Sequence, residues 1–232
     1  MSYYDNFLNR GRISKIGKLL VNRQNNFYIN TIVKNTSKKN LKILEIGPGK
    51  GYFAKKCRKF GFQYTGIESN KAICNHLQKQ GLNVFNETVP PLNLKTKFDV
   101  IVMIHVLEHI SDKNNAINLL EQCKNKLNKS GLLIISSPDI TFFKEDFFGC
   151  DYTHSFPLSL YSLKQVFIDL DLQVKFADVR VLTIRGSLAA KFVQVFINLL
   201  YNLGLIGLFF GEKAYKVKNL GHASCTVVGF KK

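Results

Sequence analysis

Short hydrophobic runs alternate with longer amphipathic stretches along most of the chain from residue 41 onward. Runs bounded by glycine or polar residues predict strands, and hydrophobic positions that recur every three or four residues predict helices. Strands that alternate with helices require crossover connections, so we expect a mostly parallel sheet with helices on both faces. The expected strands are residues 41–46, 63–67, 82–85, 98–104, 131–136, 173–183 and 223–230, and the expected helices are 51–60, 70–80, 113–128 and 158–170.

Further helical sequence lies before and within this pattern. Residues 5–33 have hydrophobic positions at helical spacing, interrupted by Gly11 and Gly17. Residues 188–210 are almost entirely apolar, and their clearly polar side chains fall on one narrow stripe of a helix. These side chains are Lys191, Gln194, Asn198 and Asn202. A helix this long would cross a bilayer, but one crossing would separate the last strand from its sheet. We therefore expect packing on the domain, a dimer contact, or a helix in a membrane interface.

One domain accounts for the whole chain. Its 232 residues suffice for a single apolar core, and neither an internal repeat nor a change in composition divides them. Hydrophobic residues make up 46% and charged residues 21%, which excludes a disordered, collagen-like or polytopic membrane protein. The expected parts are an N-terminal helical extension at 1–39, a core at 40–185, an apolar helical insertion at 186–222 and a last strand at 223–232.

The cysteines and the charge bear on location and partners. The five cysteines include no CxxC pair, and the N-terminus shows no signal-peptide pattern, so we expect free thiols in the cytoplasm. The net charge is +17, and residues 1–60 hold 14 basic and two acidic side chains. Such a field favours nucleic acid, an anionic lipid surface or a phosphorylated substrate. The excess of lysine, 27 against six arginines, also matches an AT-rich genome, and we weigh that explanation first.

A glycine-rich loop follows the first expected strand. In Gly47-Pro48-Gly49-Lys50-Gly51 the glycines permit a sharp turn, and the helix that follows offers free N–H donors. Tyr52 occupies the third glycine position of a dinucleotide fingerprint, so that motif is absent. Glu68 lies 21 residues after Gly47 at the end of the second strand, where a carboxylate can accept hydrogen bonds from ribose hydroxyls.

Four segments, in this order, resemble the motifs of class I S-adenosylmethionine-dependent methyltransferases. They are residues 44–53, 66–69, 98–110 and 130–136, and the resemblance extends over about 40–185. It implies a Rossmann-like sheet of seven mostly parallel strands, the last one antiparallel. It also implies S-adenosylmethionine (SAM) as cofactor, with S-adenosylhomocysteine (SAH) as product.

The resemblance assigns cofactor contacts to several positions. The glycine loop would meet the methionine and ribose parts, with Glu45 holding the loop or the amino group, or only fixing the turn from below. Glu68 would bind the ribose, unless it is a solvated acid at a strand end. Asn86 and Glu87 would meet the adenine. The full expected set is Glu45, Gly47, Pro48, Gly49, Tyr52, Phe53, Glu68, Ser69, Asn86, Glu87, Ile104 and His105.

Two histidines are candidates for the general base that takes the acceptor's proton. His109 ends a Leu-Glu-His segment that resembles the ubiquinone-type O-methyltransferases, in some of which the acid–histidine pair holds a metal. His154 ends an aromatic-rich stretch within residues 142–157. Either one would alternatively hold a loop or a helix start. We assign no metal ligand.

These expectations combine into methyl transfer from SAM to an oxygen, ahead of a nitrogen, of a small acceptor. Anionic compounds and glycan or lipid precursors are the acceptor classes considered. The alternatives are an RNA methyltransferase and a non-catalytic methyltransferase-like subunit. No separate nucleic-acid-binding module is recognisable, so we expect no nucleic acid partner. A peripheral membrane contact or a homodimer through residues 188–210 would use the apolar insertion.

Overall fold

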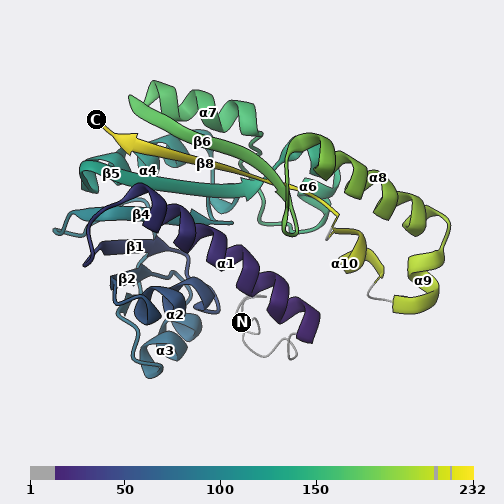
Figure 1. The fold of residues 1–232 in the computed structure, drawn as a ribbon, viewed down its shortest axis with the longest axis horizontal. Helices are drawn as coiled ribbons and strands as arrows, with labels where there is room; N and C mark the ends of the chain where they lie inside the picture. The colour runs from purple at the N-terminus through teal and green to yellow at the C-terminus, as the bar shows by residue number, and fades with distance from the viewer. Residues whose placement is uncertain (1–13, 212–213, 220) are drawn as a thin grey trace.

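A twisted sheet runs through the computed structural model, which describes residues 14–211, 214–219 and 221–232. Within these residues eight strands lie in the order β3-β2-β1-β4-β5-β8-β6-β7 (Figure 1). Strands β1 to β5 pair in parallel, and β8 lies antiparallel between β5 and β6. The strands are β1 (Lys42–Ile46), β2 (Gln63–Ile67), β3 (Val84–Phe85), β4 (Phe98–Ile104), β5 (Leu127–Pro138), β6 (Leu172–Val181), β7 (Ile184–Arg185) and β8 (Ser224–Lys231).

The expected fold is confirmed, with one extra strand. The stretch expected as a single strand at 173–183 ends at Val181, because Leu182 has a positive φ of 52° and the chain turns back. Residues Ile184–Arg185 then form the short strand β7 antiparallel to β6, with Arg180 opposite Arg185. This hairpin adds an eighth strand at the edge of the sheet and leaves the seven expected strands in place.

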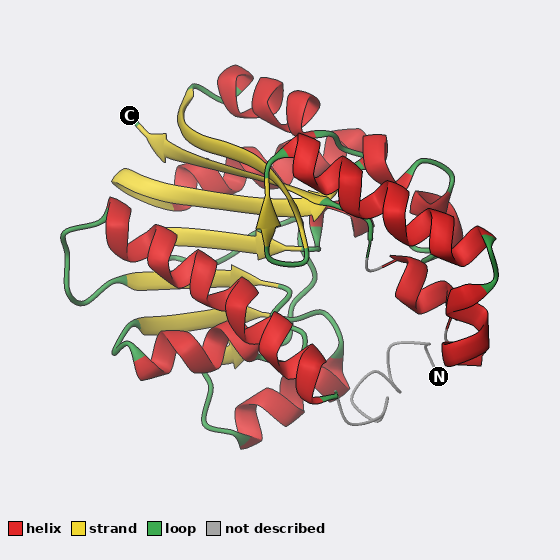
Figure 2. Cartoon of the chain, turned by 45° about the vertical axis from the view of Figure 1, so that its right-hand side comes forward, coloured by secondary structure: helices red, strands yellow, loops and turns green. Residues whose placement is uncertain are grey.

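Helices cover both faces of the sheet (Figure 2). One face is covered by α1 (Lys15–Asn35), α2 (Tyr52–Lys59) and α3 (Lys71–Lys79), and the other by α4 (Lys113–Lys126) and α7 (Leu160–Asp169). Successive side chains of a strand point to opposite faces, so Ile43 packs under α1 to α3 and Leu44 packs with α4 and α7. The two apolar layers hold the strand ends in fixed positions.

The N-terminal helix starts later than residue 5. Ser14 caps it by accepting a hydrogen bond from the backbone N–H of Gly17, so Gly17 lies inside the helix and does not interrupt it. Residues 5–13 of the expected helix lie outside the described part of the chain. The buried side chains Tyr28, Ile29 and Ile32 attach α1 to the sheet.

The apolar insertion consists of three helices, α8 (Ser187–Asn202), α9 (Leu205–Phe210) and α10 (Ala214–Asn219). Its expected continuous helix breaks at Gly204, whose φ is 72°. Figure 1 shows the insertion beyond the carboxyl ends of β4 and β5. Between β5 and α7 the chain forms two single-turn helices, α5 (Ile140–Phe143) and α6 (Asp146–Gly149).

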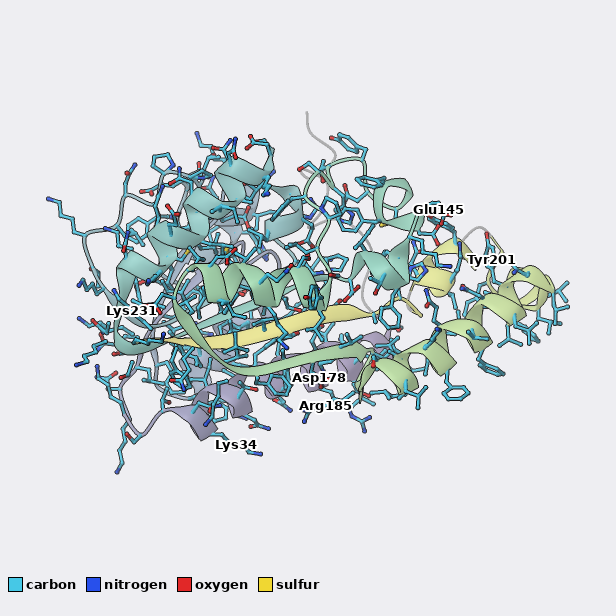
Figure 3. All side chains as sticks on the ribbon, turned by 90° about the horizontal axis from the view of Figure 1, so that it is seen from above. Lys34, Glu145, Asp178, Arg185, Tyr201 and Lys231 are labelled. Carbon is cyan, nitrogen blue, oxygen red and sulfur yellow. The ribbon has the colours of Figure 1, made fainter. Side chains whose placement is uncertain are left out.

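Part of the apolar surface of α8 packs on the domain, and a larger part stays exposed. Gln194 and Asn198 of its polar stripe lie partly buried on the domain side, where the Gln194 amide donates a hydrogen bond to the Phe142 carbonyl, whereas Lys191 and Asn202 are exposed. The opposite side points outward (Figure 3), and Phe192 on α8 and Phe209 on α9 are 70% and 82% exposed. On the domain side of α8, Ala190 and Val193 pack in a small apolar cluster with Val179, Val181 and Ala223. Among the described residues, no helix has both the length and the apolar character needed to span a membrane.

Candidate functional site

A cleft of about 450 Å³ opens at the carboxyl ends of β1, β2 and β4. In a parallel α/β sheet this is the edge at which ligands bind. Backbone groups of the glycine loop form one wall, and the segment after β4 forms another. The residues that line the cleft are Gly47, Gly49, Glu68, Ser69, Asn70, Ile73, His105, Val106, His109 and Thr153.

The glycine loop lies too close to its neighbours for larger residues. Gly47, Gly49 and Gly51 all have positive φ, between 52° and 71°. A Cβ atom on Gly47 would lie 2.4 Å from Val106 Cγ2. The loop therefore presents bare backbone to the cleft, which suits close contact with a ligand.

Glu68 connects the loop to the end of β2. Its Oε2 accepts a hydrogen bond from the Gly49 backbone N–H at 3.3 Å, and its Oε1 accepts one from the Asn70 N–H at 3.0 Å. Burial raises the pKa of this carboxyl. Asn86 supports the same turn from β3, because its amide donates to the backbone carbonyls of Glu68 and Ser69.

Glu45 lies below the loop and is not among the residues that line the cleft. It is buried, and the Tyr64 hydroxyl donates a 2.6 Å hydrogen bond to its Oε2. Burial raises its pKa to about 8. Glu45 is thus buried, as the alternative interpretation expected, but its hydrogen bond comes from Tyr64 on β2, and its role toward the loop or a cofactor stays a prediction.

Several other expected cofactor residues are near the cleft without lining it. Phe53 is buried in the core under α2, whereas Tyr52 is partly exposed. Pro48 accepts the Gly51 N–H within the loop. Of the expected set, Gly47, Gly49, Glu68, Ser69 and His105 line the cleft, while Pro48, Tyr52, Phe53, Asn86, Glu87 and Ile104 do not. Their contacts with a cofactor stay predictions.

His105 lines two pockets at once. It lies in the cleft and also in a second pocket of about 320 Å³ between α1, β6 and β8. Its backbone has a positive φ of 55°, uncommon for a residue with a Cβ, and its N–H is bonded to the Ser136 carbonyl. His105 Nδ1 lies 3.3 Å from Glu108 Oε1, and Nε2 lies 3.4 Å from the Ser224 hydroxyl.

Glu108 is fully buried beneath the site. Ser137 donates a hydrogen bond to its Oε2, and within the described residues Oε1 accepts none. The Glu108 backbone carbonyl accepts the N–H groups of Ser155 and Phe156, which attaches the aromatic-rich loop to the end of β4. The sequence named this carboxylate only as the acid of the acid–histidine pair that the resemblance implies, because its position beside His105 depends on the turn at residues 105–109.

The two expected catalytic histidines lie together, with ring centroids 4.9 Å apart. His109 lines the cleft and shares a 2.8 Å hydrogen bond with the Thr153 hydroxyl, and burial lowers its pKa. His154 lines neither pocket. Its Nδ1 is bonded to the Phe147 carbonyl, and its ring packs on the Phe147 ring.

Glu108, His109 and His154 also have the geometry of a candidate metal centre. Each offers one ligand atom, and these atoms lie within 4.8 Å of one another. Two imidazoles and a carboxylate suit a divalent transition metal. The absence of a metal role therefore stays a prediction.

Comparisons with known proteins agree with this geometry. A family model described as a methyltransferase domain matches residues 21–180. Ubiquinone biosynthesis O-methyltransferases from Pelagibacter ubique and Histophilus somni are 30% and 29% identical over 105 and 113 residues, which cover 43% and 44% of this chain. The same matches cover 42% and 46% of those enzymes, so the chain spans less than half the length of these curated relatives.

Solved structures share the fold over nearly the whole chain. A SAM-dependent methyltransferase from Archaeoglobus fulgidus has a TM-score of 0.65 at 20% identity, covering 99% of this chain and 100% of the other. Magnesium protoporphyrin IX methyltransferase from Synechocystis with bound SAM also has a TM-score of 0.65, at 10% identity, covering 100% and 92%. The family model matches well over half of the chain, and the motifs, the sheet order and the cleft all agree with it. This chain belongs to the methyltransferase domain family, of the class I SAM-dependent type.

Proposed function

We propose that this protein transfers the methyl group of SAM to an oxygen atom of a small acceptor. The observation that carries the proposal is the position of His105, which lines both the cleft behind the glycine loop and the second pocket. A methyl transfer needs donor and acceptor sites that meet at one point, because the reacting atoms must be aligned. A histidine at that point is also able to accept a proton.

The cleft fits SAM on the donor side. Gly47 and Gly49 present backbone without side chains, and the Glu68 carboxylate lies at the end of β2, where ribose hydroxyls can donate to it. Asn86 holds this turn in place. When bound, SAM supplies a methyl group activated by a positively charged sulfur.

His105 would act as the general base. The Glu108 carboxylate beside Nδ1 would stabilise the tautomer that carries its proton there, and Nε2 would then accept a proton from an acceptor hydroxyl in place of its contact with Ser224. Glu108 would also stabilise the imidazolium that forms. An oxygen acceptor suits this arrangement, since a hydroxyl must lose its proton during methylation.

His109 and His154 would play different parts in this proposal. His109 borders the donor cleft and would help to shape it. His154 would hold the aromatic-rich loop through its bond to the Phe147 carbonyl. Both would become ligands if a divalent metal binds with Glu108.

The insertion supports a place for the protein at a membrane surface. The outward side of α8 and α9 is apolar, and residues 187–211 contain Lys191 but no acidic residue. Lys15 and Lys18 are exposed at the end of α1 that lies towards the insertion (Figure 1). Apolar side chains flanked by basic ones match an anionic lipid surface. A lipid precursor, as in the named reaction of the ubiquinone relatives, is therefore one acceptor class that fits.

Calorimetric titration with SAH, with NAD as the comparison ligand, tests the proposed cofactor. Micromolar binding of SAH alone is the expected result, and it would justify screening acceptors for methyl transfer. Failure of a folded sample to bind SAH would contradict the proposal and favour the non-catalytic subunit. Methylation of RNA in preference to small molecules would favour the other alternative.

A further inference from the structure

The second pocket contains buried polar atoms that lack hydrogen-bond partners among the described residues. It has a volume of about 320 Å³ and lies between α1, the end of β6 and the start of β8. Three of its lining residues have a buried side-chain atom without a hydrogen bond to any described residue: Arg180 Nη1, Asn219 Oδ1 and His222 Nδ1. Buried polar groups are nearly always hydrogen-bonded, so three unpartnered atoms in one pocket point to a ligand.

Arg180 forms no ion pair with a described residue, although Asp178 acts on it at longer range. Its guanidinium lies 3.5 Å from the centroid of the Phe27 ring, and no carboxylate of the described residues lies within ion-pair distance. Arg185, directly opposite it in the β6–β7 hairpin, instead pairs with Asp178 at 2.6 Å (Figure 3). Arg180 is half-buried with its Nη1 fully buried, so burial works against its charge, and an anionic ligand would offset that cost. The planar guanidinium fork matches carboxylate and phosphate oxygens.

His222 and Asn219 contribute hydrogen-bond acceptors to the pocket, whereas Arg180 contributes a donor. His222 Nε2 lies 3.3 Å from Asp146 Oδ2, so the proton on the ring is stabilised at Nε2 and the unpartnered Nδ1 carries a lone pair. Burial lowers the pKa of His222, which favours this neutral form. Asn219 Oδ1 is a second unpartnered acceptor. A ligand that satisfies both must donate, as hydroxyl groups do.

We propose that the second pocket binds an acceptor that carries both an anionic group and hydroxyl groups, with Arg180 as the residue that selects the anion. This inference rests on the proposed methyl transfer and names its acceptor class, a hydroxylated carboxylate or phosphate. His105 borders the same pocket, so an acceptor anchored at Arg180 presents its hydroxyl to the proposed base. Arg180 thereby sets which molecules are methylated.

The anion site can be tested without knowing the acceptor. The melting temperature of the full chain is measured in inorganic phosphate and in acetate, each against sodium chloride of equal ionic strength. An anion that binds only the folded state raises the melting temperature, here by roughly 5 °C at saturating concentration. We expect this rise in wild type and in the matched control Arg185→Met, and its loss in Arg180→Met. Equal rises in all three proteins, or no rise in wild type, would overturn the proposal.

Two further measurements keep the test decisive. If Arg180→Met does not fold, Arg180→Lys keeps the charge but not the fork, and it should bind phosphate or acetate at least about threefold more weakly. Equal affinity in that variant would count against Arg180. SAH is titrated into the same samples. A wild type that does not bind SAH would contradict the proposed function. A wild type that binds SAH but shows no anion effect would contradict only the proposed anion site.

Acceptor pairs that differ in one anionic group identify its chemistry. Calorimetry in the presence of SAH compares 3,4-dihydroxybenzoate with catechol, and glucose 6-phosphate with glucose. One charged member should bind wild type at least about 10-fold more tightly than its neutral partner, since a charged hydrogen-bonded pair contributes that much. Arg180→Met should lose the preference. Equal binding within both pairs would overturn the proposal, and the pair that shows a preference separates carboxylate from phosphate.

Discussion

Glu68 Oε2 lies 3.3 Å from the backbone nitrogen of Gly49, and this hydrogen bond joins the end of β2 to the loop after β1. The two residues come from neighbouring parallel strands, which bring their carboxyl ends to one edge of the sheet. Both line the cleft. The carboxylate therefore acts twice in our proposal, by positioning the loop and by accepting hydrogen bonds from the ribose.

Replacing Glu68 tests this double role. Glu68→Ala should weaken SAH binding by about 10- to 100-fold, because hydrogen bonds to a charged group and the loop support are lost together. Calorimetry measures the change. Glu121→Ala removes an exposed carboxylate on α4 and serves as the control, with unchanged affinity expected. Equal affinity of Glu68→Ala and wild type would exclude Glu68 from the cofactor site.

Glu45 gives the protein a predictable pH dependence. Burial raises its pKa from an ordinary value of 4.5 to about 8, so between these values folded Glu45 keeps a proton that the unfolded chain has lost. The folded state then binds more protons, and the free energy of unfolding falls as the pH rises from 4.5 to about 8. Over this range the melting temperature of wild type should fall relative to Glu45→Gln, by about 5 °C or more.

Thermal unfolding of both proteins across this pH range checks that prediction. Tyr64→Phe is a useful companion, because the Tyr64 hydroxyl stabilises the charged form of Glu45 and lowers its pKa. Without it the destabilisation at high pH should be larger. Parallel pH profiles for wild type and Glu45→Gln would show that the carboxyl titrates normally in the folded protein.

The sequence predicts those features that depend on neighbours along the chain. Strand and helix periodicity, the positive-φ glycines of the loop and the acid at the end of β2 are each encoded within a few residues, and the parallel sheet then brings them together. Glu68 could therefore be assigned before the structure was known. The ends of the strands are predicted less accurately than their positions. Strand β6 ends where Leu182 adopts a positive φ, and the hydrophobic pattern of the sequence gives no sign of that turn.

Features that arise from tertiary contacts could not be predicted in this way. Arg180, on β6, and His222, before β8, are 42 positions apart and meet only because β6 and β8 pair. Nothing local distinguishes Arg180 from Arg185 either, although only the second has an acid beside it. The outward apolar side of α8 likewise depends on which surface of the domain was left for the insertion.

The proposed base predicts a split among the histidines. His105→Gln should lower kcat by about 10²- to 10⁴-fold once an acceptor is in hand, because a positioned base contributes that much. His154→Gln should lower kcat less, since His154 lines neither pocket. His76→Gln, on α3, is the control and should behave as wild type. The rates are measured at saturating SAM and acceptor across a range of pH.

The pH profile separates a base from a merely structural histidine. A general base produces an acidic limb in the profile of rate against pH, and His105→Gln should lose that limb. Glu108→Gln should also lower kcat, because the carboxylate beside Nδ1 would no longer orient the imidazole. If His154→Gln lowers kcat more than His105→Gln does, and it is His154→Gln that loses the acidic limb, the general base is His154 and not His105.

The exposed side of the insertion leads to the last prediction. Wild type should sediment with phosphatidylcholine vesicles that contain phosphatidylglycerol, and less with phosphatidylcholine alone, because basic residues flank the apolar side. The double variant Phe192→Glu/Phe209→Glu should lose at least about 10-fold in vesicle affinity, since two large apolar side chains no longer leave water. Ile168→Glu is the matched control, because Ile168 is 63% exposed but lies on α7.

Comparing these variants shows whether the apolar side of α8 and α9 binds a membrane surface or a second copy of the chain. Binding that is equal in wild type and the double variant, or that Ile168→Glu weakens as strongly, would contradict docking through α8 and α9. Sedimentation velocity without lipid measures whether the protein is a monomer or a dimer. A wild-type dimer that the double variant dissociates, combined with no binding to vesicles, would show that the apolar side is an interface between copies. A monomer that binds anionic vesicles through Phe192 and Phe209 would place the pocket around His105 and Arg180 close to the lipid, where an amphiphilic acceptor with an anionic head is accessible.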